Sequence, residues 1–360
     1  MIIVAIITGL FFGVLVLYFI VFQLGVRSSK KGYDKIQPVS VIIAAKNEES
    51  NIKACLKSII KQDYSSFEII LVDDHSSDRT SEIARKIQTE FPDLKITQAK
   101  EHGKKSAIKQ GILEAQHEYL LFTDADCQAP STNWINRMMS YFDQDTSIVL
   151  GYSPYQLKKS LTNYIQQYET LLTACLYVSA VHYYRPYMAV GRNLAYRKSV
   201  FTESSRFNKH LDLLSGDDDL FIQEMATQKN TKVCLDAEAF VESKPANNLK
   251  FLFRQKLRHI STADHYRWKD KFLLSLFHFA RFGILLAFLL LIILTDQQLI
   301  ATIGLLSYFM VLQLAFFRPC RKLSSPKINW YIPLLELFLV VFHITLLFYK
   351  LFSSKKIRWK

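Results

Sequence analysis

The sequence is poor in glycine and proline, with 11 and 9 of them among 360 residues. This scarcity excludes collagen-like, low-complexity and disordered classes, in which these residues are abundant. Cysteine is also sparse, and none of the five cysteines forms a C-x-x-C pair with another. Neither a disulfide framework nor a cysteine zinc site is indicated, and a reduced, cytosol-facing compartment is expected. The length suits two domains, or one domain with membrane segments.

Negative charge is scarce in the last third of the chain. Residues 250–360 hold 17 Lys and Arg against 4 Asp and Glu, whereas residues 1–249 hold 28 of each sign. The excess of positive charge lies between long apolar runs rather than beside a polar face or aromatic platform. It therefore predicts membrane-flanking charge and no nucleic-acid partner.

Four apolar stretches predict a multi-pass protein of the cell membrane. Residues 1–24 carry no charge and no signal-peptide cleavage pattern, so we expect a retained N-terminal transmembrane anchor. Arg27, Lys30 and Lys31 follow at once and predict that the chain continues in the cytoplasm. Within a C-terminal membrane region, residues 261–360, two or three further transmembrane helices are expected at about 273–294, 299–317 and 328–352.

The number of crossings in the C-terminal region stays open. His278 and Arg281 interrupt the stretch 273–294, so it is either a full span or an interfacial element. If all three stretches cross, the basic tail ends outside; if the first does not cross, the basic loop Arg318–Lys327 lies outside. Each arrangement breaks the positive-inside rule once, and we favour four crossings in all.

Residues 36–260 are expected to form a cytoplasmic α/β catalytic domain. Short β-branched runs alternate with amphipathic ones, which predicts a Rossmann-like, mainly parallel sheet with helices on both faces. Ligands of such sheets bind beyond the carboxyl ends of the strands. The predicted strands are residues 39–45, 67–73, 94–99 and 118–124.

Acidic residues follow two of these strands. Asp73 and Asp74 offer acceptors to a base or ribose, although capping of the next helix is the alternative at this loop. Asp124 and Asp126 have a spacing that lets both reach one divalent cation, although an isolated D-x-D is more often a structural turn. No glycine follows the first strand, so a dinucleotide-binding Rossmann motif is absent.

A third acidic cluster is the run Gly216-Asp217-Asp218-Asp219. Adjacent carboxylates raise one another's pKa, so a purely structural run is costly unless it is solvated. A carboxylate held near a reacting hydroxyl can accept its proton as general base. This cluster is therefore a candidate for catalysis.

Taken together, these motifs resemble those of the family 2 glycosyltransferases, which are inverting, nucleotide-sugar-dependent enzymes of GT-A fold. The resemblance covers about residues 38–260 and keeps the family's order. The blocks that carry it are VSVIIAAKNEESNI, EIILVDDHSSDRT, HGKKSAIKQGI, FTDADC, GRNLAYRKSVF, SGDDDLF and RQKLRH.

The resemblance implies roles for the matched positions in the binding of the donor nucleotide. Ala45, Glu48 and Asp74 would line the base and ribose site, with Asp73 close by. Lys104 would lie near the nucleotide. The donor would be a UDP- or GDP-linked sugar.

The resemblance also implies catalytic and metal-binding roles. Asp124 and Asp126 look like the pair that holds Mg²⁺ or Mn²⁺ against the diphosphate. Asp217 and Asp218 look like the family's acidic pair, of which the second acts as the base.

Two further blocks imply contacts with sugar and phosphate. Gly191, Arg192 and Asn193 would lie beside the donor sugar and the acceptor. Gln255 would lie there too, and Arg258 would pair with the diphosphate. These two residues match Q-x-x-R-W, whose tryptophan is replaced here, so a non-processive enzyme is favoured.

The implied function is transfer of a sugar to a lipid-linked, polyprenyl-phosphate-linked or polysaccharide acceptor at the cytoplasmic face, in synthesis of cell-envelope glycan or glycolipid. The basic charge and apolar helices suit an acceptor that resides in the membrane. Two alternatives stay open. One is another metal-dependent nucleotide-sugar enzyme, such as a nucleotidyltransferase, and the other is a non-catalytic membrane scaffold that retains the fold.

Overall fold

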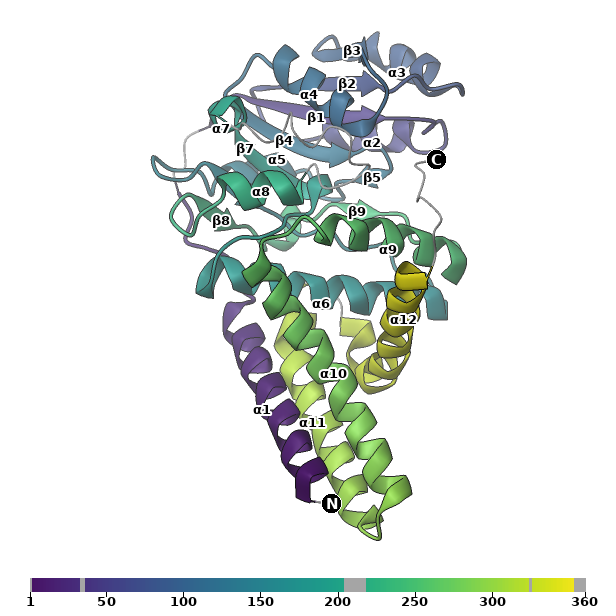
Figure 1. Ribbon diagram of the computed structural model, residues 1–360. Helices are drawn as coiled ribbons and strands as arrows, with labels where there is room; N and C mark the ends of the chain where they lie inside the picture. Colours follow the sequence, from purple (N-terminus) through teal and green to yellow (C-terminus); the bar gives the residue numbers. More distant parts are fainter. Residues whose placement is uncertain (1, 33–35, 204–217, 324–325, 353–360) are drawn as a thin grey trace. The chain divides into compact units, whose positions relative to one another are not determined.

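The computed structural model describes residues 2–32, 36–203, 218–323 and 326–352, which form two compact units (Figure 1). The first, here called the helical unit, comprises Met1–Val26, Lys159–Ser179 and Ala246–Ile357. The second, here called the sheet unit, comprises Arg27–Lys158, Ala180–Pro245 and Arg358–Lys360. The domain boundaries expected from the sequence stay a prediction, because the two units are grouped by contacts that are not continuous in sequence.

The four predicted strands are present in the sheet unit: β1 (Val39–Ala45), β2 (Phe67–Asp73), β3 (Leu94–Gln98) and β4 (Tyr119–Asp124). They are parallel and lie in the order β3-β2-β1-β4. Side chains on both faces of β1 and β2 are buried, as expected for apolar, β-branched runs in the centre of a covered sheet. The prediction of a mainly parallel sheet is confirmed.

Helices cover both faces of this sheet (Figure 1). Odd-numbered side chains of β1 pack with α2 (Ile52–Ile60) and α3 (Thr80–Gln88) in one apolar core. The other face carries α4 (Lys104–Glu114), where Gly111 approaches Ile42 so closely that a Cβ on the glycine would lie 2.7 Å from Ile42 Cγ2. The alternation of side chains along β1 thus assigns each helix to its face.

Short strands extend the sheet beyond β4. β7 (Leu194–Arg197) is antiparallel to β4 and to β6 (Ile148–Leu150), and β8 (Thr231–Val233) is parallel to β6. The result is a mixed, mainly parallel sheet of seven strands, and a separate antiparallel pair is formed by β5 (Cys127–Gln128) and β9 (Glu242–Ser243). The other elements of the sheet unit are α5 (Trp134–Met139), η1 (Gly191–Asn193), α7 (Lys198–Glu203), α8 (Asp219–Met225) and η3 (Ala237–Ala239).

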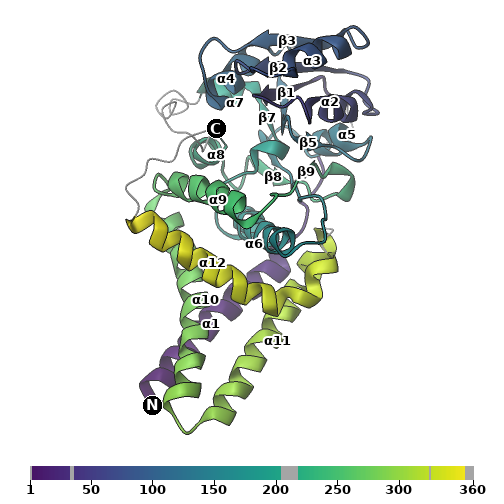
Figure 2. The ribbon, with the colours of Figure 1, turned by 90° about the vertical axis from the view of Figure 1, so that its right-hand side faces the viewer.

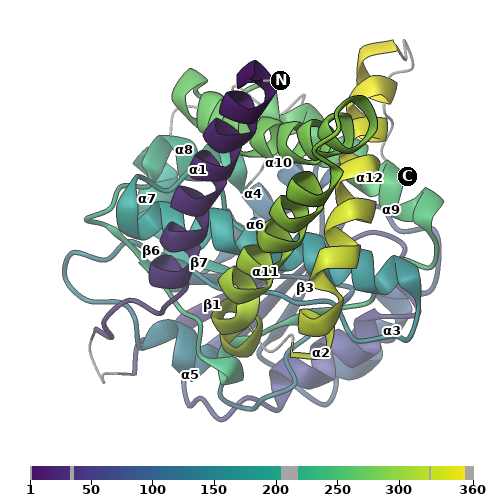
Figure 3. The same ribbon diagram turned by 90° about the horizontal axis from the view of Figure 1, so that it is seen from below.

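Among the described residues, the helical unit contains four helices that are long and apolar enough to cross a membrane (Figures 1 and 3). They suggest membrane association, as the sequence predicted. These candidates are Ile3–Gly25, Trp268–Leu294, Gln298–Lys322 and Lys327–Phe352. The elements of the unit are α1 (Ile2–Gly25), α6 (Leu161–Tyr183, which ends in the sheet unit), α9 (Leu249–Ala263), α10 (Trp268–Leu294), α11 (Gln298–Lys322), η4 (Pro326–Tyr331) and α12 (Ile332–Phe352).

Aromatic side chains hold α1 against α10 and α11. The ring of Phe22, which is 1% exposed, lies 5.7 Å from that of Phe277 and 6.1 Å from that of Phe316, measured between centroids. Gly283 on α10 allows Phe11 of α1 to approach its backbone. The three helices therefore pack as one bundle.

Candidate active site

The carboxyl ends of β1, β2 and β4 lie side by side at one edge of the sheet (Figure 1). Ala45 pairs in register with Asp73, and Ala44 pairs with Asp124. The residues that follow each strand therefore project beyond the same edge. This is the edge at which α/β sheets bind ligands, and it brings the predicted nucleotide residues and the D-x-D pair together.

Asp74 is a firmly held acceptor at this edge. Its side chain is buried, and its Oδ1 accepts a hydrogen bond from the Gly103 amide at 2.9 Å. The Lys46 ammonium lies 3.2 Å from Oδ2. The Asp74 amide donates to the Ala45 carbonyl at 2.8 Å, so two residues predicted to line the nucleotide site are in contact.

The neighbouring carboxylates Asp73 and Glu48 hold the loops around Asp74. Asp73 Oδ2 accepts from the Ser81 hydroxyl at 2.7 Å, at the start of α3. Glu48 donates through its backbone amide to Thr80 Oγ1 at 2.7 Å and accepts from Asn51 Nδ2 at 2.6 Å. These bonds fix the loop after β1 against the loop after β2, and a nucleotide contact from either side chain stays a prediction.

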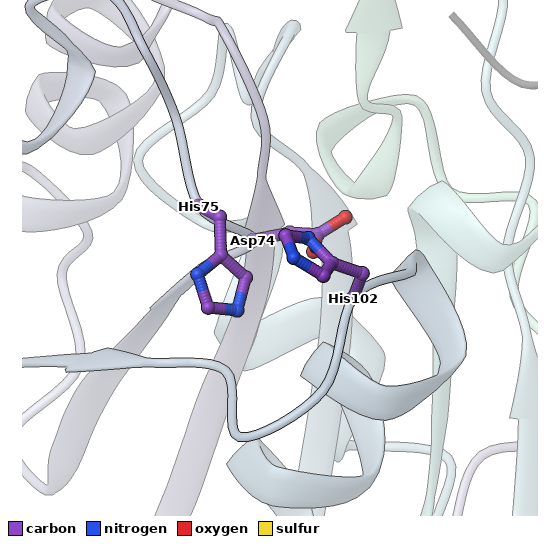
Figure 4. A group of neighbouring side chains, drawn as sticks. All are labelled: Asp74, His75 and His102. Carbon is purple, nitrogen blue, oxygen red and sulfur yellow. The ribbon is translucent and has the colours of Figure 1, made fainter.

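Figure 4 shows Asp74 beside two imidazole rings, those of His75 and His102. The ring centroids are 4.0 Å apart, and His102 Nδ1 lies 3.9 Å from Asp74 Oδ1. His75 has a φ of 54°, a left-handed conformation that is uncommon outside glycine. The three side chains are close enough to hold a metal ion. However, Lys46 already supplies a positive charge to the carboxylate, so the geometry favours an aromatic surface, with the two rings tilted by 39°, beside a buried acceptor.

Asp124 and Asp126 form a compact acidic pair. Their carboxylate oxygens lie within 4.8 Å of each other. Burial and the neighbouring charge of Asp124 raise the pKa of Asp126. Lys104, predicted to lie near the nucleotide, places its ammonium 2.7 Å from Asp124 Oδ1. Hard oxygen donors of this kind are those that Mg²⁺ and Mn²⁺ prefer, so the pair fits a divalent cation.

Cys127 directly follows the acidic pair. Its thiol is buried, and burial raises its pKa well above the usual range, so it stays protonated at neutral pH. Its Sγ lies 3.0 Å from Ser243 Oγ, which links β5 to β9. Its Sγ also lies within 4.8 Å of the ligand oxygens of Asp124 and Asp126, so the three side chains are close enough to share a metal ion.

Arg192 brings a fixed positive charge to the acidic pair. Its Nε donates to Ser153 Oγ at 2.7 Å, and its guanidinium lies 4.9 Å from the centroid of the Tyr155 ring. The charge of Arg192 lowers the pKa of Asp126, against the larger effect of burial. The guanidinium is therefore oriented by neutral partners and acts electrostatically on the acidic pair.

Asn193, predicted to contact sugar, is fully buried and bonded within the protein. Its Nδ2 donates to the carbonyls of Tyr152 and Ala239 at 2.7 and 2.8 Å, and its Oδ1 accepts from Trp134 Nε1 at 3.0 Å. Both amide hydrogens and one acceptor position are thus occupied. In this structure Asn193 positions the neighbouring Gly191 and Arg192.

Asp218 is tied to the same loop as Arg192. Its Oδ2 accepts a hydrogen bond from the Gly191 amide at 2.7 Å, and its Oδ1 accepts from the Asp219 amide at 2.9 Å, at the start of α8. The predicted base is thereby connected to the edge that carries Asp124. Its predicted partner, Asp217, lies outside the described residues.

Gln255 and Arg258 lie on α9, within the helical unit. They are three residues apart, so their side chains leave the same side of the helix. Their predicted contacts with sugar and diphosphate stay predictions.

Several residues of the site were not anticipated from the sequence. Lys46 and His102 flank Asp74, whereas Ser153 and Tyr155 orient Arg192. Lys46 could have been found, because it directly follows the first predicted strand. Ser153 and Tyr155 follow β6, whose three residues give too little pattern to predict a strand.

Residues 40–204 match the family model described as glycosyl transferase family 2. The chain contains a family 2 glycosyltransferase domain. The matched range includes all of β1 but its first residue, β2 to β4, the acidic pair and the loop of Arg192.

Curated relatives match this domain over part of its length. Glycosyltransferase AglE of Haloferax volcanii is 38% identical over 105 residues, which is 28% of this chain and 34% of that protein. Poly-beta-1,6-N-acetyl-D-glucosamine synthase of Staphylococcus epidermidis is 32% identical over 101 residues, or 27% of this chain and 24% of that protein. The chain thus spans about a third or less of the length of these relatives.

The similarity to a solved structure extends over almost the whole chain. The mannosyltransferase PcManGT from Pyrobaculum calidifontis, solved in complex with GDP-Man and Mn²⁺, aligns over 98% of this chain and 99% of its own, with a TM-score of 0.63. At 16% sequence identity this likeness shows the fold. The expected GT-A architecture with apolar helices is confirmed.

Proposed function

We propose that this chain is a membrane-bound, inverting glycosyltransferase that moves a sugar from a nucleotide-diphosphate donor to an acceptor hydroxyl. The observation that carries the proposal is the convergence at one sheet edge of Asp74, the pair Asp124 and Asp126, and the Gly191 loop that binds Asp218. A nucleotide, a cation and a proton acceptor are the three components that such a transfer requires.

Asp124 and Asp126 are the residues that would hold Mg²⁺ or Mn²⁺. The pair fits the ion because burial and the neighbouring charge of Asp124 raise the pKa of Asp126, and a bound cation would stabilise both ionised carboxylates. A bound ion would neutralise negative charge on the diphosphate. The related mannosyltransferase from P. calidifontis was solved with Mn²⁺, which supports this assignment.

Lys104 and Arg192 assist at the same place. The Lys104 ammonium contacts Asp124 at 2.7 Å, and the charge of Arg192 lowers the pKa of Asp126. Their positive charges favour the approach of an anionic diphosphate and its departure as leaving group. Because both side chains are already held by the protein, little reorganisation is needed when charge develops.

Asp218 is the proposed general base. Two backbone amides, those of Gly191 and Asp219, orient its carboxylate. A carboxylate fixed in this way can accept the proton of the attacking hydroxyl, which typically contributes about 10²–10⁴ in rate. Attack by that hydroxyl on the anomeric carbon, opposite the leaving nucleotide, inverts the configuration in a single displacement.

The nucleoside would lie against Asp74. This buried carboxylate can accept from a base or ribose donor, and the rings of His75 and His102 offer an aromatic surface next to it (Figure 4). Ala45, Asp73 and Glu48 complete the loops around it. The proposed donor is a UDP- or GDP-linked sugar.

The acceptor is proposed to be lipid-linked, polyprenyl-phosphate-linked or a growing glycan at the cytoplasmic face. Four apolar helices support a membrane-resident acceptor, because a soluble one would not require them. The helix α9 carries Lys250, Arg254 and Arg258, which suit an anionic headgroup surface, whereas Lys256 is paired with Glu169. Gln255 is proposed to contact the sugar, and Arg258 is proposed to pair with the diphosphate of the donor. The pathway proposed is synthesis of cell-envelope glycan or glycolipid.

A donor screen on the purified full-length protein tests the proposal. Release of nucleoside diphosphate is measured for UDP- and GDP-sugars with Mn²⁺ and a membrane lipid extract. We expect one donor class to give turnover, Asp218→Asn to lose about 10²–10⁴ of it while retaining nucleotide affinity, and Asp145→Asn, at an exposed loop position, to match the parent.

Full turnover in Asp218→Asn would remove Asp218 from the role of base. Release of pyrophosphate from a nucleoside triphosphate would instead indicate a nucleotidyltransferase. Nucleotide binding without turnover on any donor would indicate a scaffold.

A further inference from the structure

The hairpin of α10 and α11 defines two opposite ends of the helical unit. Only residues 295–297 separate the two helices, so they are antiparallel neighbours. The start of α10 and the end of α11 therefore lie together, at what we call the basal end, and residues 295–297 form the distal end. The 27 residues of α10 set these ends about 40 Å apart.

α1 runs from the distal to the basal end. The Tyr18 hydroxyl donates to the carbonyl of Leu273 at 2.8 Å, close to the start of α10. Farther along, Gln23 Nε2 donates to the carbonyl of Ala315 at 2.8 Å, close to the end of α11. The last turn of α1 is thus at the basal end, where the chain leaves for the sheet unit.

α12 does not run from the basal end to the distal end. Although it follows the end of α11, its own last turn also lies at the basal end. Lys350 Nζ lies 2.6 Å from Asp264 Oδ1 and donates to the Ile260 carbonyl at 3.3 Å. Asp264 precedes the first residue of α10 by only four positions. A helix that began at the basal end and ran toward the distal end would place Lys350, 18 residues after Ile332, about 27 Å from that end. Figure 2 shows α12 running obliquely across the hairpin, close to α9.

The other half of α12 is fixed near the middle of the hairpin. Glu336 accepts from Arg281 at 2.6 and 2.7 Å, from Tyr308 at 3.2 Å and from Tyr168 at 2.8 Å. Arg281 lies 13 residues into α10, or about 20 Å from the basal end. Between Glu336 and Lys350 the helix therefore returns from this depth to the basal end.

We propose that α12 does not cross the bilayer, and that it enters and leaves the leaflet on the basal side. The chain then crosses three times, through α1, α10 and α11. One face of α12 is buried against the protein, while the opposite face exposes apolar side chains to the acyl chains of that leaflet. Exposed apolar residues on this face include Leu334, Leu337, Phe338, Val341, Phe348 and Phe352.

Charge along the sequence agrees with three crossings. Arg27, Lys30 and Lys31 follow α1, and Arg318, Arg321, Lys322 and Lys327 surround the end of α11, so both groups lie at the basal side. The distal link holds Asp296 and no basic residue. The basic residues after Phe352 lie outside the described part of the chain, and a three-crossing path assigns them to the basal side as well. All flanking positive charge is then cytoplasmic, whereas four crossings would break the rule.

Labelling of single introduced cysteines tests this path independently of the proposed chemistry. A membrane-impermeant maleimide is applied to intact cells and to inside-out vesicles that contain the full-length protein. The five native cysteines are buried, and the unsubstituted protein gives the background. We expect a cysteine appended after Lys360 to label only in inside-out vesicles, like Lys322→Cys, and Asp296→Cys to label only in intact cells. Labelling of the appended cysteine together with Asp296→Cys would overturn the proposal.

Cross-linking gives a second readout that does not depend on labelling. A short bifunctional thiol reagent should join the cysteines of the double variant Asp264→Cys/Lys350→Cys in membranes. The matched pair Asp296→Cys/Lys350→Cys should not be joined. The reverse pattern would show that α12 crosses.

Discussion

The two units differ in how far their charged pairs are exposed to solvent. In the sheet unit, the side chains of Asp124 and Lys104 stay 31% and 26% exposed, although they are in contact. In the helical unit, Glu336 and Arg281 are 0% and 3% exposed, and two tyrosine hydroxyls complete their hydrogen bonds. Charges that remain accessible at a sheet edge are available to a ligand, whereas a sealed pair fixes the arrangement of helices.

Removing one member of the sealed pair is expected to give the largest change in stability. Glu336→Gln keeps the shape of the side chain but leaves Arg281 buried without its counter-charge, which typically costs about 3–5 kcal/mol. Thermal unfolding of the detergent-solubilised protein measures the loss, with Asp296→Asn as an exposed control in the distal link. An unchanged unfolding temperature in Glu336→Gln would show that the pair does not stabilise the helices.

The same type of substitution at the open site should affect ligand binding instead. Asp126→Asn removes one proposed cation ligand, and we expect Mn²⁺-dependent affinity for the nucleoside diphosphate to fall about 100-fold. Stability should not decrease, because burial and Asp124 already disfavour the Asp126 charge. Calorimetric titration with and without Mn²⁺ measures this effect. Equal affinities in Asp126→Asn and the control Asp145→Asn would contradict the metal site.

A structural carboxylate also lies in the sheet unit, at the edge opposite the site. Burial raises the pKa of Glu68, but hydrogen bonds from Lys95, Ser40 and the Gln116 amide outweigh it, so the pKa is lowered overall. A lowered pKa means that ionised Glu68 adds stability above the unfolded pKa of about 4.3, and that this contribution is lost as pH falls below that value.

Glu68→Gln should therefore lose about 1–3 kcal/mol of unfolding free energy at pH 7, since the buried donors lose a charged acceptor. The difference from the parent should shrink as pH falls below about 4.3. Denaturant unfolding of both proteins between pH 7 and pH 3.5 measures it. A difference that grows toward acid pH would contradict the assignment.

The smallest effect is expected at the aromatic surface beside Asp74. His75→Ala removes one of two neighbouring rings and should weaken nucleoside diphosphate binding about fivefold, equivalent to about 1 kcal/mol. His117→Ala, before β4 at the other end of the strand, is the matched control. Identical affinities in the two variants would show that the nucleobase of the donor does not lie against His75.

Much of the sheet unit could be predicted from its sequence. The runs that form β1, β2 and β4 are apolar, and those of β1 and β2 are rich in β-branched residues; a parallel arrangement then requires Asp74 and Asp124 to share an edge. The strands β6 and β8 have three residues each, and β5 and β9 have two, which is too short for a recognisable alternation.

Contacts between residues far apart in the sequence could not be predicted. Asn193 was expected beside the sugar, which stays a prediction, but its bonds to Trp134 and Tyr152, more than 40 positions away, could not be predicted from the sequence. The path of α12 could not be predicted from the sequence either. Hydropathy gives the length and apolarity of a helix, but it does not reveal the contact between Lys350 and Asp264.

The most direct test of the account is a structure of the full-length protein with Mn²⁺ and the donor nucleotide that the screen identifies. We predict the ion between Asp124, Asp126 and the diphosphate, the nucleoside against Asp74, and Asp218 facing the anomeric carbon from the side opposite the leaving group. Nucleotide bound away from this sheet edge, or an ion that contacts neither Asp124 nor Asp126, would contradict the account.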